Sequence, residues 1–174
     1  PAMSDGKLLG FQLWINMPAS MKMNKPKYDY IKSNQKAKFV DQVKKINLIA
    51  GKFENIEGPV KGHNVEPIFF DIELNESKKI SLKVPLTHNS FIYLLGGDLK
   101  IGSKNHEKIS DSTLVLLKKG SALEVLANKK SRFLFIAGKP IGEPISRGGP
   151  FVMNTKAEIL QAIQDYNNGT FAKY

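Results

Sequence analysis

The sequence contains no cysteine. That absence excludes disulfide bonds, a thiol nucleophile and thiolate metal ligands, and it favours a reducing compartment. Long apolar runs are also missing, so no segment reaches the roughly 20 residues that a membrane-spanning helix requires. The first residues lack the apolar core of a secretory signal. We therefore expect an intracellular protein, cytoplasmic or nuclear, with no membrane partner.

Arginine is scarce, although the formal net charge is +10. Of the 26 basic residues only Arg132 and Arg147 are arginine, the side chain that most often reads guanine and holds phosphate in a two-pronged contact. The lysines are dispersed over nearly every expected loop, which is typical of a solvated surface. We expect no specific nucleic-acid partner, and only weak DNA binding that falls steeply as salt rises.

Short apolar segments are the main feature that is present. The chain has 174 residues, enough for one domain with a sizeable core or a domain plus a fragment. Alternating apolar and polar residues, with turn-forming residues between the segments, predict strands over residues 8–17, 43–50, 65–74, 80–84, 112–117, 122–127 and 132–137. Strands at such intervals, with no long helix between them, indicate an antiparallel sandwich or barrel.

The central stretch runs from Asn89 to Gly102. Its first half is apolar on both faces, which is typical of a strand buried in a sandwich. The following Gly96-Gly97-Asp98 predicts a tight turn, because glycine takes positive φ at little steric cost. Leu99 and Ile101 then predict a return strand, so we expect a central hairpin.

Two further segments have distinct patterns. The stretch from Thr155 to Glu158 is a capping box, and it predicts a helix that ends at Gly169. Residues 19–40 are polar and rich in lysine and have no apolar period. They predict an extended linker with one helical turn near Tyr28.

Four stretches, taken together and in this order, resemble the pirin family of the cupin superfamily. Two of them are specific, namely Gln-Leu-Trp-Ile-Asn at 12–16 and Gly-Pro-Phe-Val-Met-Asn-Thr at 149–155. The other two are residues 89–98 and 137–144. The resemblance implies an all-β fold, a cupin double-stranded β-helix or jelly-roll barrel with a C-terminal α-helix.

The resemblance also implies an organisation and a function. Pirins are bicupins that hold one iron in the N-terminal cupin through three histidines and a glutamate, and they are associated with quercetin 2,3-dioxygenase activity and with transcriptional co-regulation. The family's iron ligands precede the stretch that corresponds to residues 12–16, so no residue here matches one. On this basis residues 1–18 are a remnant strand of the N-terminal cupin, 19–40 a linker and 41–174 the C-terminal cupin.

We therefore expect a structural and protein-interaction module without a metal, a cofactor or a catalytic residue of its own. The expected partner is an N-terminal cupin or a second copy of the chain, bound through residues 8–17. A full-length parent would carry the iron and act as a quercetin 2,3-dioxygenase-like oxidoreductase or a co-regulator of transcription.

The histidines were the remaining candidates for a metal site. A cupin site needs two histidines one residue apart and a glutamate shortly after, but the positions two residues from His88 hold Leu86 and Ser90. His63 and His106 fall in expected turns, where solvent exposure is the simpler interpretation. The alternative to an interaction module is a stand-alone small-molecule-binding cupin, with a ligand pocket at the barrel mouth near His88 and Tyr93.

Overall fold

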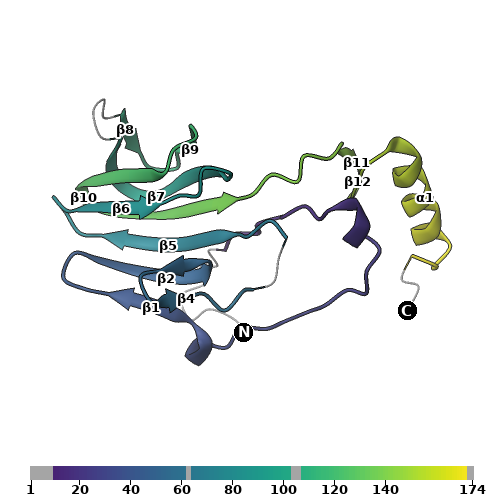
Figure 1. Ribbon diagram of the computed structural model, residues 1–174, viewed down its shortest axis with the longest axis horizontal. Helices are drawn as coiled ribbons and strands as arrows, with labels where there is room; N and C mark the ends of the chain where they lie inside the picture. The colour runs from purple at the N-terminus through teal and green to yellow at the C-terminus, as the bar shows by residue number, and fades with distance from the viewer. Residues whose placement is uncertain (1–9, 62–63, 103–106, 172–174) are drawn as a thin grey trace. The chain divides into compact units, whose positions relative to one another are not determined.

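The computed structural model describes residues 10–61, 64–102 and 107–171. The chain forms two compact units (Figure 1). One combines Pro1–Lys25 with Ile141–Tyr174, and the other consists of Pro26–Pro140. Each unit is described by itself. No helix in the described ranges is long and apolar enough to cross a membrane.

The second unit is built on one antiparallel sheet. Its strands are β1 (Ala37–Val40), β2 (Lys44–Ala50), β5 (Ile68–Leu74), β6 (Lys79–Lys83), β7 (Asn89–Ile101), β8 (Glu107–Ser110), β9 (Leu114–Leu117) and β10 (Ala122–Gly138). The order is β1-β2-β5-β10-β7-β8, while β6 pairs with β10 and β9 with β7. A short hairpin of β3 (Lys52–Phe53) and β4 (Ile56–Glu57) and the 3₁₀ turn η2 (Ser33–Gln35) complete this unit. The all-β prediction for this part of the chain is confirmed.

The core of this unit follows from the two-residue period of its strands. Ile46 on β2, Ile72 on β5 and Phe133 on β10 are fully buried. The alternate residues of the same strands, such as Lys45 and Glu73, point to the other face. Each fully buried side chain of this size contributes about 1.5–3 kcal/mol by leaving water, so the sheet is held mainly by this inner face.

The predicted turn at residues 96–98 is wrong. β7 continues through it as one strand of 13 residues, and its register with β10 shifts in this region. Ile92 and Leu94 are buried before the shift and Leu99 after it, so the buried positions change from even to odd numbers. Gly97 has φ +109°, which allows this irregularity. Glycine thus bends a continuous strand, and both halves keep their apolar side chains inward.

Two predictions for the N-terminal part also need correction. In the described range 10–17 no residue belongs to a strand, although the sequence alternates as a strand would, because a strand requires a hydrogen-bonded neighbour. The expected linker ends in β1, which pairs with β2 and packs Phe39 against the core. The helical turns in this stretch are Ala19–Met21 (η1) and Ser33–Gln35 (η2), and neither lies at Tyr28. The domain boundaries at residues 18 and 40 stay a prediction.

The first unit contains the 3₁₀ turn η1 (Ala19–Met21), the hairpin of β11 (Ser146–Gly148) and β12 (Phe151–Met153), and helix α1 (Lys156–Asn167). The predicted capping box is confirmed, since Thr155 Oγ1 accepts from the Glu158 amide while the Glu158 carboxylate accepts from the Thr155 amide. The helix buries Ile159 against the hairpin, at a point where Gly148 leaves room for it.

Candidate functional site

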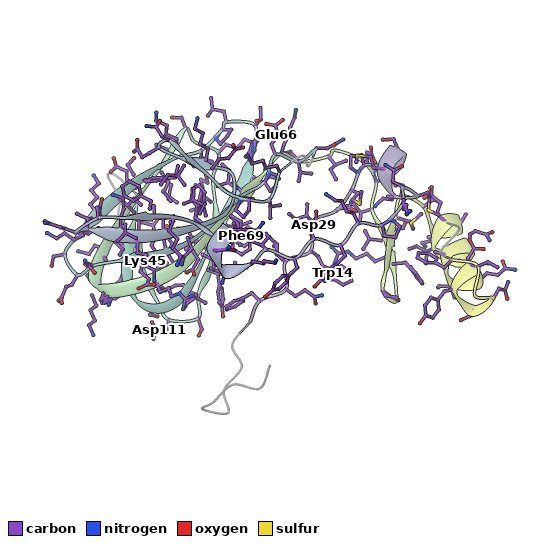
Figure 2. The ribbon with its side chains drawn as sticks, turned by 90° about the horizontal axis from the view of Figure 1, so that it is seen from below. Trp14, Asp29, Lys45, Glu66, Phe69 and Asp111 are labelled. Atoms are coloured by element: carbon purple, nitrogen blue, oxygen red, sulfur yellow. The ribbon has the colours of Figure 1, made fainter. Side chains whose placement is uncertain are left out.

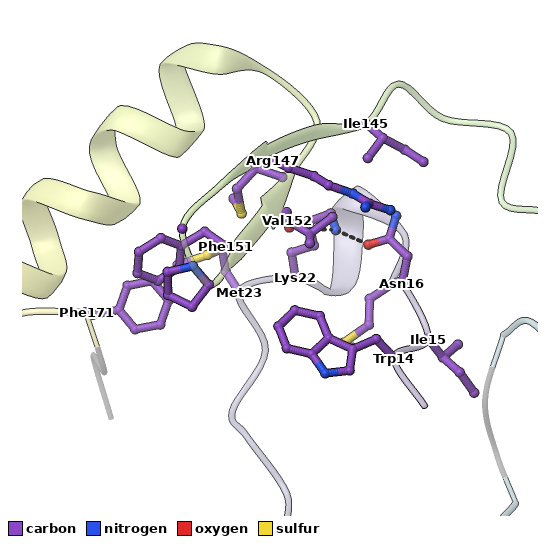
Figure 3. A pocket seen from close by; sticks show the side chains of 14 residues that line it. Trp14, Ile15, Asn16, Lys22, Met23, Ile145, Arg147, Phe151, Val152 and Phe171 are labelled. Atoms are coloured by element: carbon purple, nitrogen blue, oxygen red, sulfur yellow. Dashed lines mark hydrogen bonds between the residues drawn. The ribbon is translucent and has the colours of Figure 1, made fainter. Parts of the chain in front are cut away.

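The first unit contains a partly open cavity of about 590 Å³ (Figure 3). Its wall combines the N-terminal segment with the hairpin and with Phe171, four residues beyond the end of α1. The lining residues are Trp14, Ile15, Asn16, Met17, Lys22, Met23, Ile145, Arg147, Gly149, Pro150, Phe151, Val152, Met153 and Phe171. The two most specific sequence stretches, 12–16 and 149–155, therefore meet at one surface.

Aromatic and sulfur-containing side chains dominate this surface. The rings of Phe151 and Phe171 lie 5.0 Å apart between centroids, and Tyr166 meets Phe151 edge-on at 6.0 Å. Trp14 remains 63% exposed and Met23 53% exposed. A tryptophan with this much free surface, beside flexible methionine side chains, is typical of a surface that adapts to an apolar partner.

Lys22 fixes the N-terminal segment to the hairpin. Its Nζ donates to Asn16 Oδ1 at 2.6 Å and to the Val152 carbonyl oxygen at 3.1 Å, as the first of these bonds shows in Figure 3. The ammonium group therefore joins two segments that are 130 residues apart in the chain. Without it the cavity wall would lose a contact that sets its shape.

Glu143 provides a second tie within the same unit. Its Oε2 accepts from the backbone amide of Ala19 at 2.7 Å and from Asn154 Nδ2 at 2.9 Å. Asn154 also donates to the Pro144 carbonyl oxygen at 3.0 Å, while its own Oδ1 is buried without a hydrogen-bond partner among the described residues. The carboxylate thus anchors the chain just after the strand-like stretch.

The described residues of this lining are mainly apolar. They include two cations, Lys22 and Arg147, and no serine, histidine, aspartate or glutamate. Lys22 is engaged in structure, and Arg147 adds a second cation at the wall. The surface can hold an apolar group and orient it with few polar contacts.

The structure separates the two residues predicted to form a ligand pocket. His88 is buried, with Nε2 2.9 Å from the Glu66 carbonyl oxygen and Nδ1 3.2 Å from Thr87 Oγ1. Tyr93 alternates with the buried Ile92 and Leu94 on β7, so it lies on the other face of the strand. A ligand at either residue stays a prediction.

The family resemblance implies an iron site of three histidines and a glutamate. Within residues 10–61, 64–102 and 107–171 no three histidine or acidic side chains are grouped so that they could hold a metal ion. The His88 ring is already hydrogen-bonded on both nitrogens, and His63 and His106 lie outside the described residues. The described residues therefore do not fit a three-histidine, one-glutamate site.

Sequence patterns identified part of the cavity and missed another part. Trp14 and Phe151 belong to the specific stretches that drew attention in the sequence. Lys22 was placed in a polar linker, and Phe171 follows the helix with no motif around it. A lysine in a polar segment has no sequence pattern that predicts a part-buried hydrogen bond, because the fold decides which acceptors lie within reach of its ammonium group.

Comparison with known proteins gives a consistent family. A family model described as the pirin C-terminal cupin domain matches residues 69–172. Pirin-1 of Arabidopsis thaliana is 37% identical over 163 residues, which cover 91% of this chain and 56% of that protein. Human pirin is 36% identical over 162 residues, again with 91% and 56% coverage.

A solved structure agrees with these sequences. The crystal structure of quercetin 2,3-dioxygenase from Acinetobacter baumannii superposes with a TM-score of 0.84 at 31% identity, covering 91% of this chain and 55% of that one. The match confirms the cupin fold. The chain spans 65% of the length of its relative from Thermoplasma acidophilum and less of the others named here.

Proposed function

This chain belongs to the pirin family, and we propose that it serves as the structural and protein-interaction half of a two-cupin protein. The occupant of its apolar surface is an N-terminal cupin domain, the part of the longer relatives that this chain does not cover. The surface consists of the cavity wall in the first unit together with residues 10–17. The observation that carries the proposal is the exposure of Trp14 within this surface.

Exposed large apolar residues occur in both units, and those of the first unit include several that line its cavity or lie beside it. In the first unit Phe11, Trp14, Ile15, Met17, Met23 and Ile145 are each 42–63% exposed. Soluble monomers rarely leave large contiguous apolar patches uncovered, and patches of this kind usually mark an interface. The tryptophan, the methionines and the cavity between them supply an anchor and a pocket of the sort that dominates interface energies.

The backbone gives a second argument. Residues 10–17 have the alternation of a strand, yet the structure gives them no strand ladder. An extended segment of this type can add to the edge of a partner's sheet through its main-chain hydrogen bonds. A cupin barrel has sheet edges, so an N-terminal cupin would complete the segment as a strand and cover its apolar side chains together.

The activity of the whole protein is a further part of the proposal. The solved relative from Acinetobacter baumannii is named a quercetin 2,3-dioxygenase, and this chain matches about half of it. We assign a quercetin 2,3-dioxygenase-like activity, and the iron it requires, to the N-terminal cupin of a full-length parent. Transcriptional co-regulation, which the family resemblance also implies, belongs to the same parent.

The test uses the remainder of the Acinetobacter baumannii protein as the partner. We expect it to bind this chain at a one-to-one ratio and to slow hydrogen exchange at the amides of residues 11–17. Trp14→Ala should weaken binding by about tenfold or more, since a buried tryptophan anchor is worth at least that much. Leu116→Ala removes an exposed leucine from β9 in the other unit and should change nothing.

Two results would contradict the proposal. Slow exchange at residues 11–17 in the chain alone, independent of concentration, would mean that the segment is already covered by its own chain. Slow exchange that grows with the concentration of the chain alone would assign the surface to a second copy. Sedimentation at the same concentrations distinguishes these two cases.

A further inference from the structure

A second cavity, of about 390 Å³, lies on the outer face of the sheet in the second unit. Four cationic side chains line it, namely Lys36, Lys38, Lys45 and Arg132. Lys36 directly precedes β1, and the other three lie on β1, β2 and β10. Lys45 is labelled in Figure 2. Among the described residues of the lining, Asp71 is the single carboxylate.

That carboxylate is already engaged. Asp71 accepts two hydrogen bonds from Arg132, at 2.9 and 2.8 Å, and a third from Asn47 Nδ2 at 3.2 Å. Lys45 contacts Glu73 at 2.7 Å, outside the lining. Asp71 and Glu73 therefore neutralise Arg132 and Lys45. Neither carboxylate is left to neutralise the two remaining lysines of the lining.

Lys36 and Lys38 face the cavity without such partners. In the described part of the chain neither side chain has an ion pair. Lys38 lies opposite Asn47 in the register of β1 and β2, and both residues line the cavity. Two cations that line one cavity repel each other, and an anion bound in that cavity would offset the repulsion.

Apart from Asn47, the other described residues of the wall are apolar. They are Ile31, Leu48, Ile49 and Pro59. A ligand that fits must therefore combine one anionic group with an apolar body, since a small ion alone would leave the apolar part of the wall in contact with water. The volume lies toward the small end of the range of ligand pockets, roughly 300–1,000 Å³.

We propose that this cavity binds a small organic carboxylate. The carboxylate lies between the ammonium groups of Lys36 and Lys38, where charge-assisted hydrogen bonds are strongest. The apolar body rests on Ile49 and Pro59. Nothing in this site depends on the first unit, so the inference is independent of the interaction proposed above.

Benzoate is the probe, with two matched compounds as controls. Benzamide keeps the ring and removes the charge, and acetate keeps the carboxylate and removes the ring. At constant ionic strength we expect saturable benzoate binding by calorimetry, with the other two compounds at least about tenfold weaker. Amide chemical shifts in residues 45–49 should change with benzoate and so locate the site.

Variants separate a built site from a merely basic surface. The double variant Lys36→Ala/Lys38→Ala should weaken benzoate binding by about tenfold or more. Lys118→Ala/Lys119→Ala removes the same charge from an exposed turn and should leave the affinity unchanged. Thermal unfolding of both variants checks that each is folded.

Three results would overturn the proposal. Benzamide binding as tightly as benzoate would mean that the site does not require the negative charge. Acetate binding as tightly as benzoate would mean that the site does not require the apolar body. An equal loss of benzoate affinity in the two double-lysine variants would mean that binding depends only on the net charge of the chain. Benzoate binding that does not saturate, or that leaves the shifts of residues 45–49 unchanged, would show that the cavity takes no carboxylate.

Discussion

Asp71 and Arg132 form a two-point contact between neighbouring strands, Nε to Oδ1 at 2.9 Å and Nη2 to Oδ2 at 2.8 Å. The pair is diagonal, because Arg132 lies opposite Glu73 in the register of β10 and β5. Burial raises the pKa of Asp71. The hydrogen bonding and the charge of Arg132 outweigh this effect, so the pKa lies below its ordinary value. The hydrogen bonding that Arg132 donates to Asp71 in turn raises the pKa of Arg132.

A double-mutant cycle measures this pair. Asp71→Asn and Arg132→Gln, singly and together, should give a coupling of about 1 kcal/mol in the free energy of unfolding, at the upper end for ion pairs near a surface. The carboxylate is only 14% exposed, and the geometry is two-pronged, which favours that upper value. The same cycle on the more exposed pair Lys61–Glu57 should give a smaller coupling. Equal couplings would contradict the argument from geometry.

The stability that Asp71 contributes depends on pH in a definite direction. Because its pKa is lowered in the folded state, the contribution is complete above the unfolded value of about 3.9 and is lost as pH falls through the folded value. The free energies of unfolding of the native chain and of Asp71→Asn, measured with urea, should therefore differ at pH 6 and converge at lower pH. A difference that grows as the pH falls would mean that the charged carboxylate destabilises the fold.

Gly97 and its neighbour Gly96 provide a matched test of the bend in β7. A β-carbon on Gly97 would overlap Ser131, and φ there is +109°, whereas a β-carbon on Gly96 meets nothing within 4 Å. Gly97→Ala should lower the free energy of unfolding by about 1–3 kcal/mol, and Gly96→Ala should cost clearly less. Chemical denaturation compares the two, and similar costs would show that the bend does not depend on Gly97.

Iron binding tests the separation of functions between the two cupins. We expect this chain, purified without chelator, to hold no stoichiometric iron and to consume no oxygen with quercetin and added ferrous ion. A single imidazole already bonded to a carbonyl group is a poor site for a divalent ion, and His88 is in that position. Elemental analysis and an oxygen electrode make the measurement. One metal per chain, lost in His88→Ala, would make this barrel a catalytic site.

The sequence predicted those features that are encoded within a few residues. The capping box of Thr155 and Glu158 was predictable because both partners lie in one turn of helix. The bend at Gly97 was not, since a pair of glycines has the same local signature in a tight turn and in an irregular strand. Trp14 could be singled out from a specific motif, whereas Lys22 could not, because one of its bonding partners is 130 residues away.

The tie between Glu143 and Ala19 has a consequence for the order of folding. These residues are 124 positions apart, and the whole second unit lies between them in the chain. During synthesis the second unit can be completed while the first still lacks its hairpin and helix. The bonds of Ala19 to Glu143 and of Lys22 to Val152 can therefore form only after residues 143–152 have left the ribosome. The first unit accordingly completes its own contacts after the second unit has been synthesised.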